Sequence, residues 1–215
     1  MPLRAATIAV LALLAACGGS ADAAGKGAQA REWVIGPIIE GRNYSVNMPL
    51  HPTPRPGGGF VIDLPRSPGS VHYVTYPHGS LAGKSRIVMR YRIEADRGVR
   101  ILASSDGRSP SILTLYFQRR GDNWSARRSF ETYRWYATFA SHSPLRPGEH
   151  VIVAPLAGPW TAAGTSTARS NPAAFQAAAA NADQVGFVLG GGDGYGHGIH
   201  ATGRARLIVT DFRVE

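Results

Sequence analysis

The chain has 215 residues, of which 44% are hydrophobic, and a formal net charge of +9. The positive charge is dispersed and nearly all of it is arginine, with lysine only at Lys26 and Lys84. Dispersed charge argues against a nucleic-acid partner, because nucleic-acid binding needs a clustered basic surface. The abundant Ala, Gly and Arg are typical of a GC-rich genome, and attraction towards anionic glycans or lipopolysaccharide is the other explanation for the charge.

The N-terminal segment has the pattern of an export signal. Arg4 precedes an apolar run over residues 5–16, and this run ends in Leu14-Ala15-Ala16 directly before Cys17, the only cysteine. A transmembrane helix needs roughly 20 apolar residues, so the run is too short to span a bilayer. The segment resembles the lipobox of bacterial lipoproteins, whose cysteine carries a diacylglycerol. The resemblance implies that residues 1–16 are removed, that Cys17 is lipidated and that the mature protein is anchored to a membrane.

Two further observations concern this anchor. A single cysteine has no disulfide partner in an exported protein, and lipidation accounts for it. Gly18 stands where lipoproteins kept in the inner membrane usually have aspartate, so the resemblance implies the outer membrane of the cell envelope. A conventional signal peptide cleaved near Ala21-Asp22-Ala23 is the alternative. Residues 17–30 are small and polar and are predicted to form a flexible tether, and residues 31–215 to form one domain.

Hydrophobicity alternates with a period of two along most of this domain, which predicts β-strands. In residues 85–94, for example, Ile87, Met89 and Tyr91 share one face. The helical crossovers that a parallel sheet requires are absent. The sequence therefore predicts an all-β fold, a two-sheet antiparallel sandwich with one short helix. The predicted strands are residues 60–64, 71–76, 85–94, 99–104, 112–119, 132–139, 150–155, 185–190 and 206–214.

The single predicted helix begins near Asn171. Asparagine is a good N-cap, Pro172 suits the first helical position, and residues 173–180 are rich in alanine. The helix is followed by a strand over residues 183–190, a glycine-rich loop, and a closing strand over residues 205–214 that contains Thr210-Asp211-Phe212. This order resembles the end of galactose-binding-like jelly rolls, a superfamily that includes carbohydrate-binding modules. The resemblance implies a jelly-roll sandwich that binds carbohydrate, with a structural calcium ion as the one cofactor that such modules often hold.

The glycine-rich loop 190–200 is the first candidate site. Glycines let the backbone approach a ligand, while Asp193, Tyr195, His197 and His200 supply a carboxylate, an aromatic ring and two imidazoles. These groups suit a sugar or a calcium ion. His197 and His200 lack a third ligand in the sequence pattern, so no transition-metal site is predicted. The alternative is a mobile connection whose side chains face water.

The second candidate site is the outward face of the strands. Trp124 lies in a polar turn with no evident core to fill, so it is predicted to be a stacking platform for a sugar ring. Arg134 and Tyr136 are predicted to project away from the core, where they would suit an anionic polysaccharide. The same patch would include Arg86, Arg90, Arg92 and Gln118. The alternative is a solvated face with salt bridges to acids such as Glu94 and Glu131. Trp33 and Trp135 are predicted to be core residues.

Enzyme motifs in the sequence are incomplete. Residues 78–85 approach a phosphate-binding loop, but His78 stands where glycine is required and no helix follows. Glu94-Ala95-Asp96 begins like the acidic strand of jelly-roll glycoside hydrolases, yet Val99 occupies the position of the acid that a hydrolase needs.

A polysaccharide lyase is the remaining enzymatic possibility, since such enzymes work with side chains like those of Tyr136, Arg134, Gln118 and His200. The sequence favours a membrane-anchored, non-catalytic carbohydrate-binding lipoprotein. A lyase or glycoside hydrolase, or a purely structural envelope lipoprotein, is the alternative.

Overall fold

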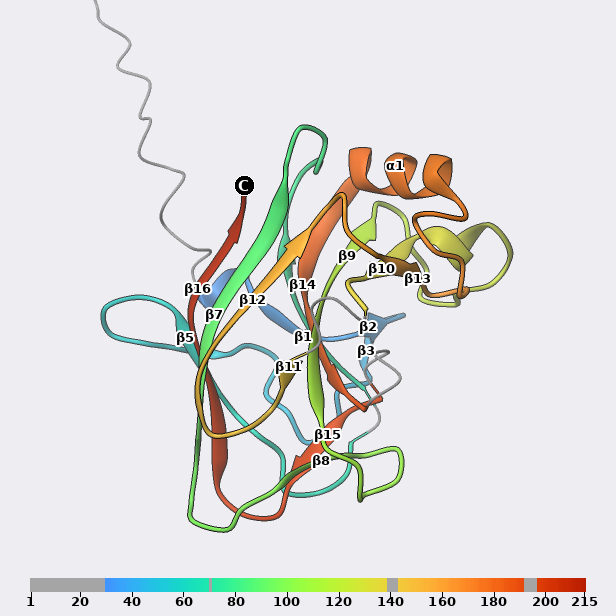
Figure 1. Cartoon of the computed structure of the whole chain (residues 1–215). Helices are drawn as coiled ribbons and strands as arrows, with labels where there is room; N and C mark the ends of the chain where they lie inside the picture. Colours follow the sequence, from blue (N-terminus) through green and yellow to red (C-terminus); the bar gives the residue numbers. More distant parts are fainter. Residues whose placement is uncertain (1–29, 70, 139–142, 192–196) are drawn as a thin grey trace, which may run out of the picture.

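Two antiparallel β-sheets packed face to face form the body of the protein in the computed structural model (Figure 1). The structure describes residues 30–69, 71–138, 143–191 and 197–215, so Cys17, Asp193 and Tyr195 lie outside the described residues. Every described strand pair is antiparallel. The prediction of an all-β sandwich with one short helix is confirmed.

The first sheet, called the large sheet below, has the strand order β1-β6-β14-β9-β10-β13, and β11 pairs with β9 beside this path. Its strands are β1 (Val34–Gly36), β6 (His72–Pro77), β14 (Ala182–Gly190), β9 (Ile112–Arg119), β10 (Arg134–Tyr136), β13 (Thr161–Ala162) and β11 (Ser143–Pro144).

The second sheet, called the small sheet below, has the order β12-β7-β16-β5-β4. Its strands are β12 (Gly148–Pro155), β7 (Arg86–Ala95), β16 (Ala205–Val214), β5 (Phe60–Asp63) and β4 (Thr53–Pro54). Two short pairs complete the described strands: β2 (Ile38–Ile39) with β3 (Arg42–Asn43), and β8 (Ile101–Ala103) with β15 (Ile199–Ala201).

The long strands alternate between the sheets along the chain. β5, β7, β12 and β16 belong to the small sheet, while β6, β9 and β14, which lie between them in sequence, belong to the large sheet. Each connection between these long strands therefore crosses from one layer to the other, and long strands that are neighbours within a sheet are distant in sequence.

Alternate side chains of the long strands fill the space between the sheets. On β7 the residues predicted to face inward, such as Met89 and Tyr91, are fully buried. They meet the inward residues of β9, including Leu115 and Phe117, in one apolar cluster. Burial of each large apolar side chain stabilises the fold by about 1.5–3 kcal/mol. Trp33 and Trp135 are also in this core, as predicted.

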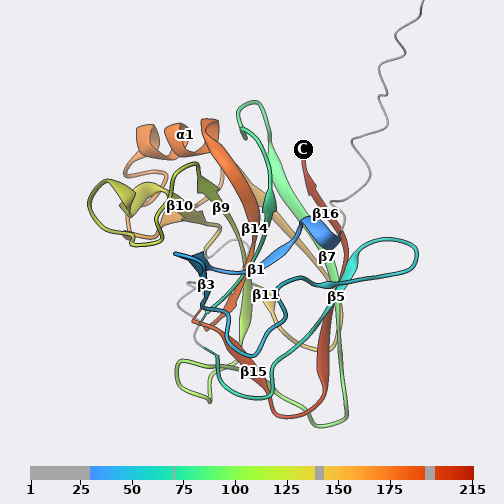
Figure 2. The same cartoon turned by 180° about the vertical axis from the view of Figure 1, so that it is seen from behind.

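Helix α1 (Pro172–Ala180) lies across one end of the sandwich (Figure 2). The Asn171 side chain accepts a hydrogen bond from the backbone N–H of Ala174, and Pro172 is the first helical residue, so the predicted helix start is confirmed. Phe175 anchors the helix, because its ring packs on Trp135 at 5.1 Å and on Phe117 at 5.7 Å between centroids.

The strand predicted over residues 132–139 is shorter in the structure, where β10 covers only Arg134–Tyr136. Thr132 is the last residue of a 3-10 helix, Arg128–Thr132, and residue 139 lies outside the described residues. The other 3-10 helix of the described residues is Ala30–Glu32. No helix among the described residues is long and apolar enough to cross a membrane.

Buried His72 joins three separate parts of the chain. Its Nδ1 lies 2.7 Å from the Ser45 hydroxyl, just after β3, and its Nε2 lies 3.3 Å from the carbonyl oxygen of Ile199 on β15. Burial lowers the pKa of His72 to about 4, so the ring is neutral at ordinary pH. The neutral ring then donates from Nε2 to the carbonyl and accepts the Ser45 proton at Nδ1.

Candidate functional site

The polar side chains predicted to form one basic sheet face lie on two different sheets. Arg86, Arg90 and Arg92 project from β7 of the small sheet, whereas Gln118 and the β10 residues belong to the large sheet. Because the sheets pack against each other, their outer faces point in opposite directions. The predicted single patch for an anionic polysaccharide is therefore not formed.

The arginines of the small sheet are paired with acids. Glu94 binds both Arg92, at 2.5 Å, and Arg206, at 2.7 Å, and Arg86 binds Glu215 at 2.7 Å. These side chains are substantially exposed, so each pair contributes little to stability. This outer face matches the alternative interpretation, a solvated surface with salt bridges.

The outer face of the large sheet is different, because aromatic side chains from three strands gather on it. Strand register places Tyr136 of β10 opposite Tyr116 of β9, and their rings stack at 5.9 Å. Tyr73 of β6 meets the Tyr116 ring edge-on at 5.1 Å. These three tyrosines and Val188, here called the tyrosine cluster, are buried.

Gly186 of β14 lies between Thr75 and Tyr116 in this register. A Cβ atom at this position would clash with the carbonyl oxygen of Val74 on β6. Only glycine therefore lets β6 and β14 lie together as they do here.

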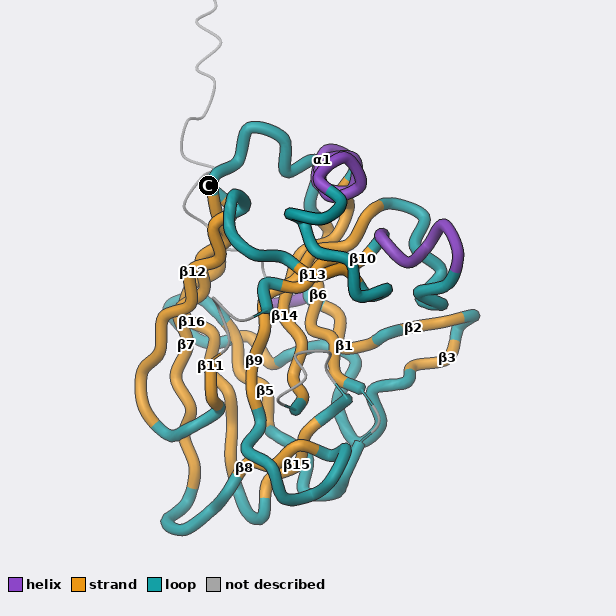
Figure 3. Tube along the Cα trace, turned by 45° about the vertical axis from the view of Figure 1, so that its right-hand side comes forward, coloured by secondary structure: helices purple, strands orange, loops and turns teal. Residues whose placement is uncertain are grey.

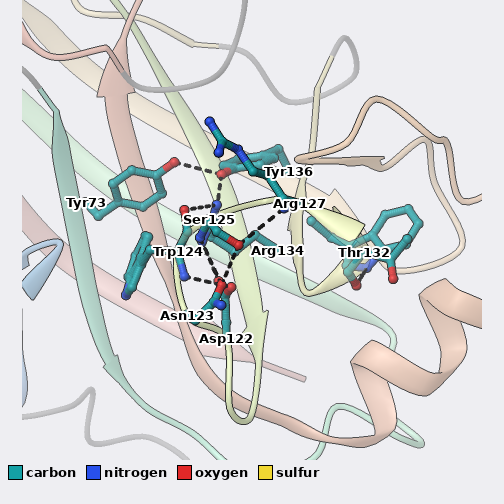
Figure 4. A network of polar contacts seen from close by, with 10 residues as sticks. Tyr73, Asp122, Asn123, Trp124, Ser125, Arg127, Thr132, Arg134 and Tyr136 are labelled. Carbon is teal, nitrogen blue, oxygen red and sulfur yellow. Dashed lines mark hydrogen bonds and ion pairs between the residues drawn. The ribbon is translucent and has the colours of Figure 1, made fainter. Parts of the chain in front are cut away.

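A polar network binds the tyrosine cluster to the loop after β9 (Figure 4). The Tyr73 and Tyr136 hydroxyls lie 2.7 Å apart, and the Nε of Arg134 donates to the Tyr136 hydroxyl at 3.3 Å. The Arg134 guanidinium also donates to the Asp122 carboxylate at 2.6 Å and to the Trp124 carbonyl oxygen at 3.1 Å. The Arg134 and Asp122 side chains are 6% and 0% exposed, so this ion pair is buried.

The network fixes the ring of Trp124. The residue adopts a left-handed backbone with φ of 67°, and its N–H donates to the Asp122 carboxylate at 3.0 Å. Its ring meets Tyr73 edge-on at 4.9 Å, and the Arg134 guanidinium lies 4.7 Å from the ring centroid. The structure thus brings together three predicted site residues, Trp124, Arg134 and Tyr136.

A groove of about 240 Å³ opens beside the half-buried Trp124. Tyr73, Thr75 and Gln184 line it from the large sheet, and the edge segment that includes Ile38 lines the other side. Glu32 is the only charged residue among the described residues that line the groove, which is chiefly aromatic and apolar with a few uncharged polar groups.

Two buried polar atoms of β9 on the same outer face have no hydrogen-bond partner within the described part of the chain. They are the Thr114 hydroxyl and the Gln118 amide oxygen. Each buried polar group left unpaired costs about 1–3 kcal/mol. Such groups are usually satisfied by water or by a ligand that brings its own polar atoms.

The ionisation of the network suits hydrogen bonding rather than proton abstraction. Burial raises the pKa values of Tyr73, Tyr116 and Tyr136 above the ordinary tyrosine value, so their hydroxyls keep their protons. Burial also raises the pKa of Asp122, although the Arg134 guanidinium opposes this shift. Burial lowers the pKa of Arg134, but the interactions with Tyr136 and Asp122 outweigh burial, so the pKa of Arg134 ends above its ordinary value.

The two predicted histidines lie away from this network. His200 is on β15, which pairs with β8 at the opposite end of the sandwich from β10 (Figure 3). Its Nδ1 is buried without a hydrogen-bond partner among the described residues, while His197 is exposed. The predicted grouping of His200 with Tyr136 and Arg134 is therefore not formed. Among the described residues, no three His, Cys, Asp or Glu side chains gather in a way that could hold a metal ion.

Sequence reasoning missed several members of the network. The predicted strands 71–76 and 112–119 include Tyr73 and Tyr116 but give them no role, and Asp122 is not among the predicted site residues. One feature of the sequence could have revealed them. The outward positions of the strand 112–119 carry Thr114, Tyr116 and Gln118, which are aromatic or uncharged polar residues, where a solvent-exposed face would carry charged ones. Comparison with protein-family models, curated proteins and solved structures gives no match to this chain.

Proposed function

We propose that the protein is a lipid-anchored protein of the bacterial envelope whose β-sandwich binds carbohydrate, without catalysis, in the groove beside Trp124. The observation that carries this proposal is the fixed Trp124 ring at the border of that groove. Sugar rings present C–H faces that pack on aromatic side chains, and their hydroxyls both donate and accept hydrogen bonds. Thr75 and Gln184 in the groove offer partners for those hydroxyls.

The strand order supports the jelly-roll part of the proposal. A jelly roll is a double sheet of eight strands built from two Greek keys, in which successive strands change sheet. The alternation of β5, β6, β7, β9, β12, β14 and β16 between the two sheets has this character. Fold alone does not determine function, so the proposal depends on the groove.

The lining of the groove favours a neutral oligosaccharide. Of the lining residues within the described ranges, Glu32 alone is charged, and Arg134 lies beneath Trp124 with its charge already paired to Asp122. The exposed arginines of the small sheet face the other way and are paired with acids. The positive charge of the chain is therefore not collected where the sugar would bind.

Two features weigh against the enzymatic alternatives. A lyase that uses tyrosine as a base needs an accessible phenolate, whereas burial keeps Tyr136 protonated. A glycoside hydrolase needs two carboxylates about the scissile bond, whereas Asp122 is fully buried against Arg134. Both features favour a binding role over catalysis.

A glycan array of neutral and anionic oligosaccharides tests the proposed function. We expect binding to a neutral glycan, and we expect Trp124→Ala to weaken it about tenfold, because a central aromatic contact is worth about 1.4 kcal/mol or more. Tyr44→Ala is the matched control, since Tyr44 is 36% exposed and does not line the groove. Absence of any glycan ligand, or equal binding by the Trp124→Ala protein, would overturn the proposal.

The anchor is tested separately. The lipobox pattern predicts that Cys17→Ser releases the protein from the membrane fraction into the soluble periplasmic fraction, measured by fractionation and immunoblotting. Persistence of the variant in the membrane fraction would contradict lipidation at Cys17.

A further inference from the structure

A second cavity lies between helix α1 and residues 156–169, the segment that follows β12 and includes β13. Its volume is about 650 Å³, and it shares no lining residue with the groove beside Trp124. Sites for small organic ligands are commonly about 300–1,000 Å³, so this cavity has the size of a ligand site.

The cavity is lined mainly by apolar side chains. Trp160 and Phe175 lie 6.1 Å apart between ring centroids, and both line it. Trp160 is fully buried, and its indole N–H already donates to the Pro155 carbonyl oxygen at 2.9 Å. Leu156 and Pro159 extend the apolar lining. A ligand would therefore meet aromatic and aliphatic carbon over most of its surface.

Among the described residues that line the cavity, Arg169 is the only charged one. It is exposed, and no ion pair or hydrogen bond of its side chain occurs within the described residues. Helix α1, which forms one side of the cavity, contains neither acidic nor basic residues. The cavity thus combines an apolar interior with one unpaired positive charge, and an anionic group on the ligand would complement that charge.

We propose that this cavity binds an amphiphilic anion. Its apolar body, best an aromatic ring system, packs against Trp160 and Phe175, and its carboxylate or sulfonate lies beside Arg169. This site is independent of carbohydrate binding, because the two cavities have different lining residues. The groove beside Trp124 suits a neutral sugar, whereas this cavity suits an apolar body that carries a negative charge.

Fluorescence titration with 1-anilinonaphthalene-8-sulfonate tests the proposal, and the uncharged N-phenyl-1-naphthylamine serves as the matched probe without the anion. We expect Arg169→Gln to weaken binding of the sulfonate about fivefold, as for loss of one partly exposed charge contact. Binding of the uncharged probe should not change. Arg55→Gln is the control variant, because Arg55 is an exposed arginine outside the cavity and its loss lowers the net charge equally.

A second variant tests the location. Ala168 lines the cavity, so Ala168→Leu should reduce the volume of the cavity and weaken the binding of both probes. Trp124→Ala should leave both titrations unchanged, which separates this site from the groove. Since the sulfonate also binds partly unfolded proteins, each variant is first checked for a cooperative thermal transition. Should Ala168→Leu prove poorly folded, Gln176→Phe at the same lining supplies the volume test. Unchanged sulfonate binding in Arg169→Gln, or in the folded volume variant, would overturn the proposal.

Discussion

The outer faces of the two sheets follow the same alternation in sequence but have opposite physical character. On the small sheet, outward residues such as Arg86 and Arg92 are charged, exposed and paired with acids in water. On the large sheet, outward residues such as Tyr116 and Tyr136 are buried beneath the loop that carries Trp124. An outward-facing strand position is therefore not necessarily a solvent position, and the chemical type of the residue shows the difference.

The two outer faces also differ in how much their ion pairs matter for the stability of the fold. Exposed ion pairs are screened by water and contribute little, whereas a buried charge that loses its partner is strongly destabilising. Sensitivity to substitution should therefore concentrate on the large sheet, although most of the charged residues lie elsewhere. The predictions below test this contrast in order of expected size.

The largest effect is expected for Asp122→Asn. This substitution keeps the size of the side chain but leaves the buried Arg134 guanidinium without its counter-ion, so the free energy of unfolding should fall by about 3–5 kcal/mol. Urea denaturation measures it. On the small sheet, Glu94→Gln removes the charge that binds Arg92 and Arg206, yet we expect a loss of about 1 kcal/mol or less. If the free energy of unfolding fell equally in the two variants, the proposed difference between the two outer faces would be wrong.

The second-largest effect is a loss of stability at acidic pH that is caused by protonation of His72. Its pKa in the folded protein is about 4, below the ordinary value of 6.5, so the unfolded chain takes up the proton first. Stability should therefore be unaffected by this group above pH 6.5. It should then fall as the pH decreases towards 4, by about 3 kcal/mol in total.

Thermal unfolding between pH 7 and pH 4 measures this loss, and His72→Gln serves as the comparison. The variant should be less stable at pH 7, because the bond with Ser45 is altered, but its stability should depend less on pH. The same acid dependence in both proteins would show that other groups are responsible.

The smallest effects should have opposite signs for two threonines, Thr114 on β9 and Thr138 shortly after β10. The Thr114 hydroxyl is buried without a partner among the described residues, so Thr114→Val should stabilise the protein by about 1 kcal/mol. The Thr138 hydroxyl lies 2.6 Å from the Thr161 hydroxyl, so Thr138→Val should destabilise it by about 1 kcal/mol. Chemical denaturation of both variants provides the measurement. A loss of stability in Thr114→Val would indicate that water satisfies this hydroxyl.

The fold and one short helix could be predicted from sequence because their signals are local. Alternation marked β7, and the Asn171-Pro172 pair marked the start of α1. The assignment of strands to sheets could not be predicted, because the long strands that are neighbours in each sheet are far apart in sequence. Arg86 and Arg134 were consequently placed on one patch, although they lie on different sheets.

Only part of the candidate site could be predicted, because some of its residues have a local signal in the sequence and others do not. Trp124 was found because a tryptophan in a polar turn is unusual, and Arg134 and Tyr136 because they alternate with buried Trp135. Their partner Asp122 gave no such signal. The cavity beside Arg169 was not predicted at all, since it depends on how an irregular segment folds against α1.

Gly186 has a consequence for recognising related proteins. Because a side chain there would strike the β6 backbone, a distant homologue that keeps the aromatic layer of the large sheet must also keep a glycine at this point of β14. A glycine within an otherwise bulky strand, together with an aromatic residue two positions after a turn aspartate, forms a compact search pattern. Such a pattern can identify relatives whose overall sequences have diverged beyond detection by ordinary alignment.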